Sequence, residues 1–432
     1  MKSIWCDSAN RRSFEQLKGD IKTDVLIVGG GIAGILCAYM LKKSGVNCVL
    51  VEADRILGAV TENTTAKITL QHGLIYHKII SKYGVDKAKM YLKAQQDALD
   101  FYAEMCSHID CDYKSQDAYV YTLNKLGELE LEASAYEKVG LKADFCKNVS
   151  LPLDVKGALR IKDQAQFNPT KFLFSLADGI NIYENTKVIE LFDGGAITNR
   201  GKIFASQIII ATHFPFMNKY GGYFLKMYQH RSYVLALKNA KIPDGMYVDA
   251  DVKGLSFREY NGMLLLGGGS HRTGKKGGAY RELEAFANKN YKDSKEVCRW
   301  ATQDCMTLDS VPYIGKYSKR LSNVYVATGF NKWGMTSGSV AARILCDMIK
   351  GKNNDYAEVF SPFRSMLHPQ FFINMGETAL NFLTPTAPRC PHLGCALKYN
   401  AEEHSWDCPC HGSRFTEQGK LIENPATDDK RL

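Results

Sequence analysis

Long hydrophobic runs are missing from this sequence of 432 residues. Its longest apolar stretches, such as residues 25–28 and 208–211, have the length of a β-strand, whereas a membrane-spanning helix needs about 20 apolar residues. The N-terminal segment 1–10 also lacks the apolar centre of a signal peptide. We therefore expect no transmembrane segment and a cytoplasmic location.

Runs of a single charge are also missing, although the formal net charge is +9. The 55 Lys and Arg residues are interspersed with 46 Asp and Glu residues, so no basic patch of the kind that binds nucleic acid is evident. We expect no nucleic-acid partner. The hydrophobic content of 45% predicts a globular protein with one large core or two moderate ones.

Cysteine is not scarce, but its distribution is uneven. Of the 13 cysteines, four lie between positions 390 and 410. The others are scattered, mostly among apolar residues, where cysteine commonly serves as a small buried hydrophobic side chain. The clustering of the four, and not the total number, therefore indicates a functional site.

A dinucleotide-binding fingerprint occupies the N-terminal part of the chain. The apolar run 24–28 predicts a β-strand, and residues 32–44 predict a helix after a glycine-rich turn. A second strand over 47–51 leads to Glu52, which follows Gly29 by 23 residues. This separation is close to that expected for the acid that binds a ribose.

The three fingerprint glycines have separate roles. Gly29 permits the tight turn, Gly31 lets the backbone approach a pyrophosphate, and Gly34 lets the helix pack closely on the strand. The positive end of the helix dipole favours the phosphates. The pattern predicts a Rossmann-type nucleotide site, but by itself it does not distinguish FAD from NAD.

A second nucleotide site is not evident in the sequence. Residues 264–269 form an apolar run that ends in three glycines, but Arg272 stands where the third fingerprint glycine belongs. No strand that ends in an acid follows at the expected distance. We interpret the segment as a strand-to-loop turn and expect no nicotinamide site.

Four later segments resemble the D-amino-acid oxidase-like flavoprotein family, which includes glycine and sarcosine oxidases. They are TENTTAKITLQHG at 61–73, IIIATHFPF at 208–216, MTLDSVPYIG at 306–315 and NVYVATGFNKWGMTSG at 323–338. The resemblance covers roughly residues 3–350 and implies FAD as the nucleotide. It also implies an α/β fold, in which a Rossmann-like FAD-binding domain is interleaved with an antiparallel-sheet substrate domain of α+β type.

The resemblance also places residues at the flavin. Similar proteins direct the N-terminus of the late helix toward the flavin N1 and C2 carbonyl, where the helix dipole stabilises the charge of the reduced form. Fingerprint and resemblance together assign FAD to Gly29, Gly31, Gly34, Glu52, Ala53, Thr64, Thr65, Lys67, Val188, Thr212, Gly329, Gly334, Met335 and Thr336. Alternatively, Thr64 and Thr65 form a solvated turn and Val188 is an ordinary core position. Thr302 stands where sarcosine-oxidase relatives have the flavin-attaching Cys, so we expect noncovalent FAD.

Substrate residues are less evident. In glycine-oxidase-like relatives, an Arg that binds the substrate carboxylate precedes the acid of the VPYIG element by five residues. Here Asp304 stands five residues before Asp309, which favours a cationic amine over a simple α-amino acid. Asp304 could instead be a surface or capping residue. His72, Lys332 and Arg258 are further catalytic candidates, because they lie near elements that approach the flavin in similar proteins.

The strongest local pattern lies near the C-terminus, where CPHLGC at 390–395 and CPCHGSRF at 408–415 contain Cys-x-His, fifteen residues and Cys-x-x-His. Two Cys and two His also suit zinc. The strings resemble Rieske proteins, in which two thiolates hold one iron of a [2Fe–2S] cluster and two imidazoles hold the other. The resemblance assigns the ligands Cys390, His392, Cys408 and His411 and a disulfide between Cys395 and Cys410, two residues that a zinc site would leave unexplained.

The domain organisation follows from these segments. We expect an oxidoreductase unit over 1–360, with FAD-binding parts at about 20–82, 151–215 and 306–352 and substrate parts at about 83–150 and 216–305. A small all-β Rieske domain is expected over 385–432. The segment 361–384 between them has a loose helical pattern of apolar residues and predicts a packed linker. Its apolar face could instead dock on a membrane surface.

These features predict an FAD-dependent oxidoreductase that takes hydride from an amine or amino-acid-like substrate and passes electrons through the cluster to an acceptor protein, quinone or oxygen. One alternative is an oxygen-using amine oxidase in which the cluster is secondary. Another is an electron-transfer or redox-sensing protein without a small-molecule substrate of its own.

Overall fold

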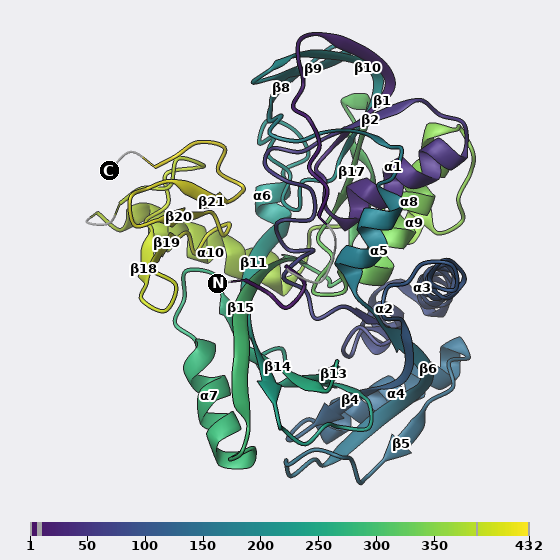
Figure 1. Ribbon diagram of the computed structural model, residues 1–432, viewed down its shortest axis with the longest axis vertical. Helices are drawn as coiled ribbons and strands as arrows, with labels where there is room; N and C mark the ends of the chain where they lie inside the picture. The colour runs from purple at the N-terminus through teal and green to yellow at the C-terminus, as the bar shows by residue number, and fades with distance from the viewer. Residues whose placement is uncertain (1, 7–10, 386–387, 431–432) are drawn as a thin grey trace.

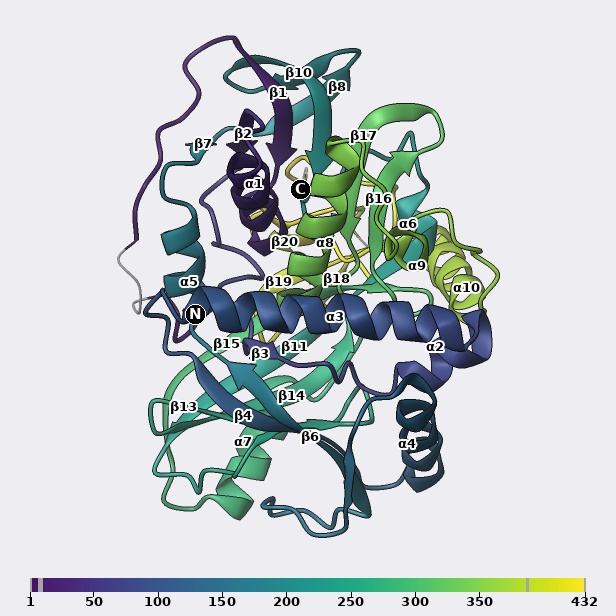
Figure 2. The same cartoon turned by 90° about the vertical axis from the view of Figure 1, so that its right-hand side faces the viewer.

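The computed structural model describes residues 2–6, 11–385 and 388–430 of the chain. Two large sheets occupy the upper and lower parts of the molecule in Figure 1, and a small third sheet near the C-terminus lies at the left. Figure 2 shows the long helix α3 (Val85–Cys106) crossing the molecule between the two large sheets.

The first sheet is mostly parallel and has the order β16-β17-β10-β1-β2-β7. Only β16 on this path is antiparallel to its neighbour, and β8 and β9 extend the sheet from β10. The end of β1 is buried throughout, as expected for an apolar run in a parallel sheet with both faces covered. The strands are β1 (Ile21–Val28), β2 (Cys48–Val51), β7 (Asn181–Tyr183), β8 (Val188–Phe192), β9 (Gly195–Thr198), β10 (Gly201–Ile210), β16 (Tyr313–Ser318) and β17 (Leu321–Thr328).

The second sheet has the order β15-β11-β14-β13-β12-β4-β6-β3, with β5 paired to β6. Most of its neighbours are antiparallel, although β12 and β4 run parallel. Its strands are β3 (Lys67–Ile68), β4 (Lys114–Thr122), β5 (Asp144–Cys146), β6 (Gly157–Gln166), β11 (Met227–Lys238), β12 (Met246–Asp249), β13 (Ser256–Tyr260), β14 (Met263–Arg272) and β15 (Lys295–Thr307).

Helices cover these sheets and tie them together. The helices α1 and α8 pack against each other at the first sheet, and α3 contacts α8. The helix α7 packs on β14 and β11. The remaining bounds are α1 (Ile32–Lys43), α2 (Tyr76–Tyr83), α4 (Leu126–Val139), α5 (Pro169–Leu176), α6 (Tyr223–Lys226), α7 (Ala279–Asn290), α8 (Gly334–Ile349), α9 (Ala357–Phe360) and α10 (Pro369–Leu383).

The third sheet is an antiparallel meander of β18 (Lys398–Asn400), β19 (Ser405–Asp407), β20 (Arg414–Thr416) and β21 (Leu421–Glu423). It packs a small core of its own around the clustered cysteines, Leu397 and Phe415. The predicted fold class is thereby confirmed: a Rossmann-like α/β part, an interleaved sheet domain and a small all-β domain.

One local prediction was wrong. The glycines at 267–269 do not form a strand-to-loop turn but lie within β14. A Cβ atom at Gly267 would lie 2.6 Å from the Ser256 Oγ, and one at Gly268 would lie 2.6 Å from the Leu255 side chain. These glycines therefore allow close packing within the sheet.

Candidate flavin cavity and cluster-binding loops

A cavity of about 720 Å³ lies between the two large sheets. Most of the residues predicted to bind FAD line it: Gly29, Gly31, Glu52, Ala53, Thr64, Thr65, Lys67, Val188, Thr212, Gly329, Gly334 and Met335. Gly34 and Thr336 lie behind its wall. Sequence reasoning missed several further lining residues, including Asn63, His213, Phe330 and Trp333, because no spacing motif marks them.

The turn after β1 fits a dinucleotide. Gly29 has a positive φ of 109°, and a Cβ there would lie 2.6 Å from the Ala211 carbonyl oxygen. A Cβ at Gly34 would lie 1.9 Å from the Gly29 carbonyl oxygen, so only glycine allows α1 to approach the turn. The Glu52 carboxylate accepts a hydrogen bond of 2.7 Å from the Gly30 amide, and burial raises its pKa.

His72 supports the N-terminus of α8. Its Nε2 lies 3.0 Å from the Thr69 carbonyl oxygen and 3.1 Å from the Thr336 Oγ1, and its Nδ1 lies 2.6 Å from the Tyr91 hydroxyl. Burial lowers the pKa of His72 to about 3, so the ring is neutral. It lines the cavity, but because both ring nitrogens are engaged it is suited to hold Thr336 in place.

Arg258 lies behind the cavity wall. Its Nη1 donates to the carbonyl oxygens of Thr65 and Ala66, the latter at 2.8 Å, and its guanidinium lies over Trp5 and Tyr260. It is fully buried and does not line the cavity, so it fixes the flavin-side loop and does not face a substrate. Burial, and then the Arg258 charge, lower the pKa of the neighbouring Lys67 to about 7.

Asp304 and Lys332 contribute two opposite charges to the cavity wall. Both line the cavity and are half-buried, and Asp304 lies within β15, so it does not cap a helix. Burial raises the pKa of Asp304 to about 6, and the positive charge of Lys332 opposes this shift. The Lys332 Nζ donates to the Ser270 Oγ at 3.2 Å, and burial lowers its pKa.

The four predicted cluster ligands lie on two adjacent loops. The rings of His392 and His411 are 4.9 Å apart and nearly perpendicular, and the neighbouring Cys408 thiol raises the pKa of Cys390. Among the residues that the structure describes, the Nδ1 atoms of both histidines are buried without a hydrogen-bond partner. Such atoms are costly unless they bind something, so two imidazoles and two thiols fit the two irons of a Rieske cluster.

The predicted disulfide is not formed in the structure, where Cys395 and Cys410 are free thiols. Their Sγ atoms and that of Cys408 lie within 4.8 Å of one another. This arrangement keeps the two thiols close enough to be oxidised after a small movement. The disulfide stays a prediction.

The cluster loops dock on residues 218–229, within the segment that the sequence assigns to the substrate part of the chain. The Nε2 of His392 lies 2.7 Å from the Asn218 Oδ1, and the ring centroids of His411 and Phe224 are 6.1 Å apart. The Gln229 Nε2 donates to the His411 carbonyl oxygen at 2.8 Å. Both imidazoles therefore point toward the rest of the same chain.

The third sheet also closes the flavin cavity. Leu421, Ile422, Glu423, Asn424, Ala426 and Thr427 line it together with the fingerprint residues. The Asn424 amide donates to the carbonyl oxygens of Thr212 and Phe214, at 2.7 and 2.9 Å, which fixes the segment against the end of β10. One domain thus contributes both the cluster ligands and part of the flavin cavity wall.

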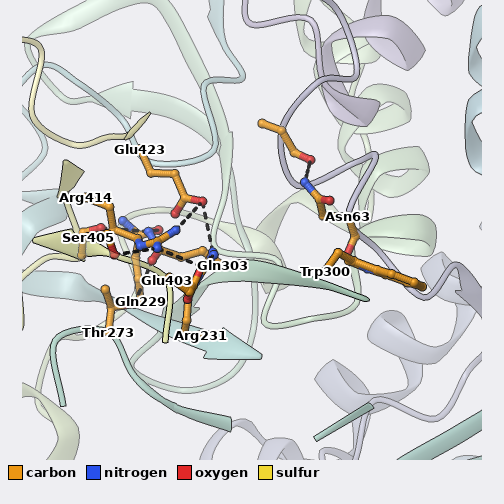
Figure 3. A network of polar contacts seen from close by, with 12 residues as sticks. Asn63, Gln229, Arg231, Thr273, Trp300, Gln303, Glu403, Ser405, Arg414 and Glu423 are labelled. Carbon is orange, nitrogen blue, oxygen red and sulfur yellow. Dashed lines mark hydrogen bonds and ion pairs between the residues drawn. The ribbon is translucent and has the colours of Figure 1, made fainter. Parts of the chain in front are cut away.

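A buried charge network joins β11 to this domain (Figure 3). Arg231 donates to Glu403 at 2.9 Å and to Glu423 at 3.1 Å, while Arg414 donates to Asp407 and Glu403, each at 2.9 Å. Burial alone would raise the pKa of Glu403, but the charges of Arg231 and then Arg414 outweigh it and hold the pKa at about 2.

We expect Glu403→Gln to destabilise the docked protein by up to roughly 3 kcal/mol at neutral pH, from the difference between the ordinary and the folded-state pKa. Because the folded-state pKa is depressed, this stabilisation is present above about pH 4.5 and is lost as pH falls toward 2. Urea unfolding followed by the circular dichroism of the cluster, at several pH values, measures it. Glu402→Gln is the control, since Glu402 pairs with the exposed Arg281. Equal pH slopes for wild type and Glu403→Gln would contradict the assignment.

The fold and the two sites define a flavin-dependent oxidoreductase that carries a Rieske cluster. The family model described as FAD dependent oxidoreductase matches residues 24–348, and the Rieske [2Fe-2S] domain model matches 381–431. The chain belongs to the FAD dependent oxidoreductase family, and it binds FAD and a [2Fe–2S] cluster. The zinc alternative is thereby set aside.

Relatives share parts of this architecture. A Rieske 2Fe-2S iron-sulfur protein of Bacillus subtilis (strain 168), YhfW, is 37% identical and aligns over 98% of this chain and 96% of its own. The γ-glutamylputrescine oxidoreductase of Escherichia coli (strain K12) is 23% identical over 85% of this chain and 92% of its own.

Solved structures agree on the fold. Glycine oxidase from Geobacillus kaustophilus superimposes with a TM-score of 0.68 and 18% identity, covering 80% of this chain and 99% of that one. L-Proline dehydrogenase from P. horikoshii gives a TM-score of 0.67 and 17% identity, covering 81% and 98%. Among the described residues, no helix is both long and apolar enough to cross a membrane.

Proposed function

We propose that this oxidoreductase acts in the cytoplasm on an amine or amino-acid-like substrate, oxidises the bond between carbon and nitrogen, and delivers the electrons through its cluster to an acceptor. The observation that carries the proposal is the pair Asp304 and Lys332 on the wall of the flavin cavity. When bound, FAD supplies a hydride acceptor and the Rieske cluster a one-electron carrier.

The charged pair suits a substrate with two polar ends. The Asp304 carboxylate can accept hydrogen bonds from an ammonium group and can take its proton, because its pKa lies near 6. Lys332 can bind an anionic group at the other end of the molecule. This second charge extends the prediction from the sequence, in which the acid alone favoured a simple cationic amine.

The comparisons support a carbon–nitrogen substrate. Relatives and structural neighbours include a γ-glutamylputrescine oxidoreductase, an L-proline dehydrogenase and a glycine oxidase. The docking of the cluster loops against the flavin cavity supports electron transfer within one chain, and it argues against a cluster that is merely secondary.

An anaerobic screen tests the proposal. Amines and amino acids with and without a distant carboxylate are mixed with the holoenzyme, and the flavin absorbance and the cluster's electron paramagnetic resonance signal are recorded. We expect at least one such compound to bleach the flavin and then reduce the cluster. Reduction by a partner protein alone, with no response to any amine, would instead support an electron-transfer protein.

A further inference from the structure

The helix α10 is amphipathic, but its polar face contacts the protein and its apolar face points outward, unlike a helix that packs on a hydrophobic core. Apart from the half-buried Phe371, its buried or half-buried stripe is polar and consists of Gln370, Asn374, Glu377, Thr378 and Asn381. These positions recur every three or four residues, so they share one face of the helix. The helix therefore contacts the protein through its polar face, an orientation that the apolar pattern alone does not specify.

Polar contacts fix this face to the protein. The Asn374 Oδ1 accepts a hydrogen bond of 2.8 Å from the Arg272 guanidinium, and the Glu377 carboxylate forms an ion pair of 2.6 Å with Lys275. The Asn381 carbonyl oxygen accepts a hydrogen bond of 2.9 Å from the backbone amide of Ala396, which belongs to the cluster domain. The helix is thus held in one rotation about its axis.

The opposite face is apolar and faces solvent. Leu367 is 77% exposed, Phe372 61%, Leu380 67% and Leu383 76%. The surface, called here the α10 face, consists of Phe363, Met366, Leu367, Phe372, Ile373, Met375, Leu380, Phe382, Leu383 and Leu393. Figure 2 shows α10 at the outer edge of the molecule, where nothing in the described chain covers it. Exposed apolar surfaces of this extent mark interaction sites.

The charges around the α10 face select the kind of partner. Between residues 363 and 383 the only acid is Glu377, which is neutralised by Lys275. Exposed lysines lie near the helix. Lys276 follows Lys275, the partner of Glu377 on the polar face. Lys82 and Lys78 of α2 act on His368 at the start of α10, where the acid Asp309 is paired with Arg364. An apolar helix face without free acids and with a cationic border is complementary to anionic lipid headgroups over acyl chains.

The cluster lies directly behind this helix. The Cys410 Sγ is 4.0 Å from the Glu377 carbonyl oxygen, and Leu393 of the first ligand loop is exposed beside the α10 face. A surface that binds α10 would therefore lie next to the cluster-binding loops.

We propose that the α10 face lies in the interfacial layer of a bilayer that contains anionic lipid. The helix has 15 residues and spans no membrane, so it lies in the plane of the surface with Phe372 and Leu380 among the acyl chains and the lysines at the headgroups. The protein docks reversibly through this single face.

Vesicle flotation of the holoenzyme tests the proposal. We expect binding to vesicles of equal parts phosphatidylglycerol and phosphatidylcholine, weaker binding to pure phosphatidylcholine, and weakening by salt. A Phe372→Ser/Leu380→Ser variant should bind at least about tenfold more weakly, because it loses two large apolar contacts. Leu131→Ser is the matched control, since Leu131 is 60% exposed on α4.

Two further measurements decide between occupants. Hydrogen exchange should show that the mixed vesicles protect residues 366–383. The double variant Lys82→Glu/Lys276→Glu should bind the mixed vesicles more weakly and should bind pure phosphatidylcholine vesicles as the wild type does. Unchanged flavin and cluster spectra verify folding of each variant. The proposal is overturned if the holoenzyme does not bind anionic vesicles, or if the control and the Phe372→Ser/Leu380→Ser variant bind them equally. It is also overturned if sedimentation shows a dimer that the Phe372→Ser/Leu380→Ser variant abolishes while vesicle binding is unaffected.

Discussion

An Asp304→Asn variant is expected to bind a reducing amine about ten- to a hundredfold more weakly than the wild type, because a hydrogen bond to a charged group contributes roughly 1.5–3 kcal/mol. Burial raises the pKa of Asp304 to about 6, against the opposing charges of Lys332 and Arg231. The carboxylate is therefore lost as pH falls below about 6, and the affinity of the wild type for a cationic amine should fall with it. Anaerobic titrations of the flavin absorbance at several pH values measure both effects.

The cavity offers a matched acid as a control. Asp249 also lines the cavity, and burial raises its pKa to about 6, but Lys332 is not among the charges that act on it. Asp249→Asn should leave the affinity and its pH dependence unchanged. Lys332→Met should weaken most the binding of substrates that carry an anionic group, and it should shift the pH profile for cationic amines upward, because the Lys332 charge lowers the pKa of Asp304. If Asp304→Asn keeps the wild-type affinity and pH profile, the ammonium lies elsewhere and the proposed orientation fails.

Local spacing accounts for the parts of the site that the sequence could predict. The turn at Gly29, the close approach at Gly34 and the acid at Glu52 depend on residues within one strand–helix–strand unit, so their separations carry the information. The same holds for the cluster ligands, which lie on two short loops with fixed spacing. FAD and the Rieske cluster, both predicted in this way, are confirmed.

Contacts between distant segments could not be predicted. Arg231 and Glu403 are 172 residues apart, and no sequence pattern near either residue predicts their ion pair. The closure of the flavin cavity by residues 421–427 likewise arises only when the small domain docks. Such contacts depend on the arrangement of whole sheets, which periodicity and motifs do not specify.

Ambiguous patterns explain one local error and one open question. Helical periodicity shows that α10 has an apolar face, but it does not say which face meets the protein, and here Asn374 and Asn381 do. The glycines at 267–269 fit a turn as well as a strand. Close packing at Gly267 against Ser256, which is a tertiary contact, decides for the strand.

A Cys408→Ser variant is expected to lose the cluster and to transfer electrons to an external acceptor at least about a hundredfold more slowly. Changes to the outer shell of a metal site alone cost about 10- to 100-fold in metal affinity, and Cys408 is a predicted ligand. Cys408 is also fully buried between the docked loops. Reduction of the flavin by substrate should proceed at the wild-type rate, because Cys408 does not line the cavity.

The two rates together separate the proposed electron path from its rivals. Stopped-flow absorbance gives flavin reduction, acceptor-linked turnover gives electron exit, and peroxide yield gives the leak to oxygen. Cys146→Ser serves as a control, because Cys146 lies in β5 of the second sheet, away from both loops. Wild-type turnover with full peroxide yield in Cys408→Ser would identify an oxidase with a secondary cluster. Slow acceptor-linked turnover with fast flavin reduction requires that electrons leave through the cluster, whose ligands His392 and His411 dock on residues 218–229 of the same chain.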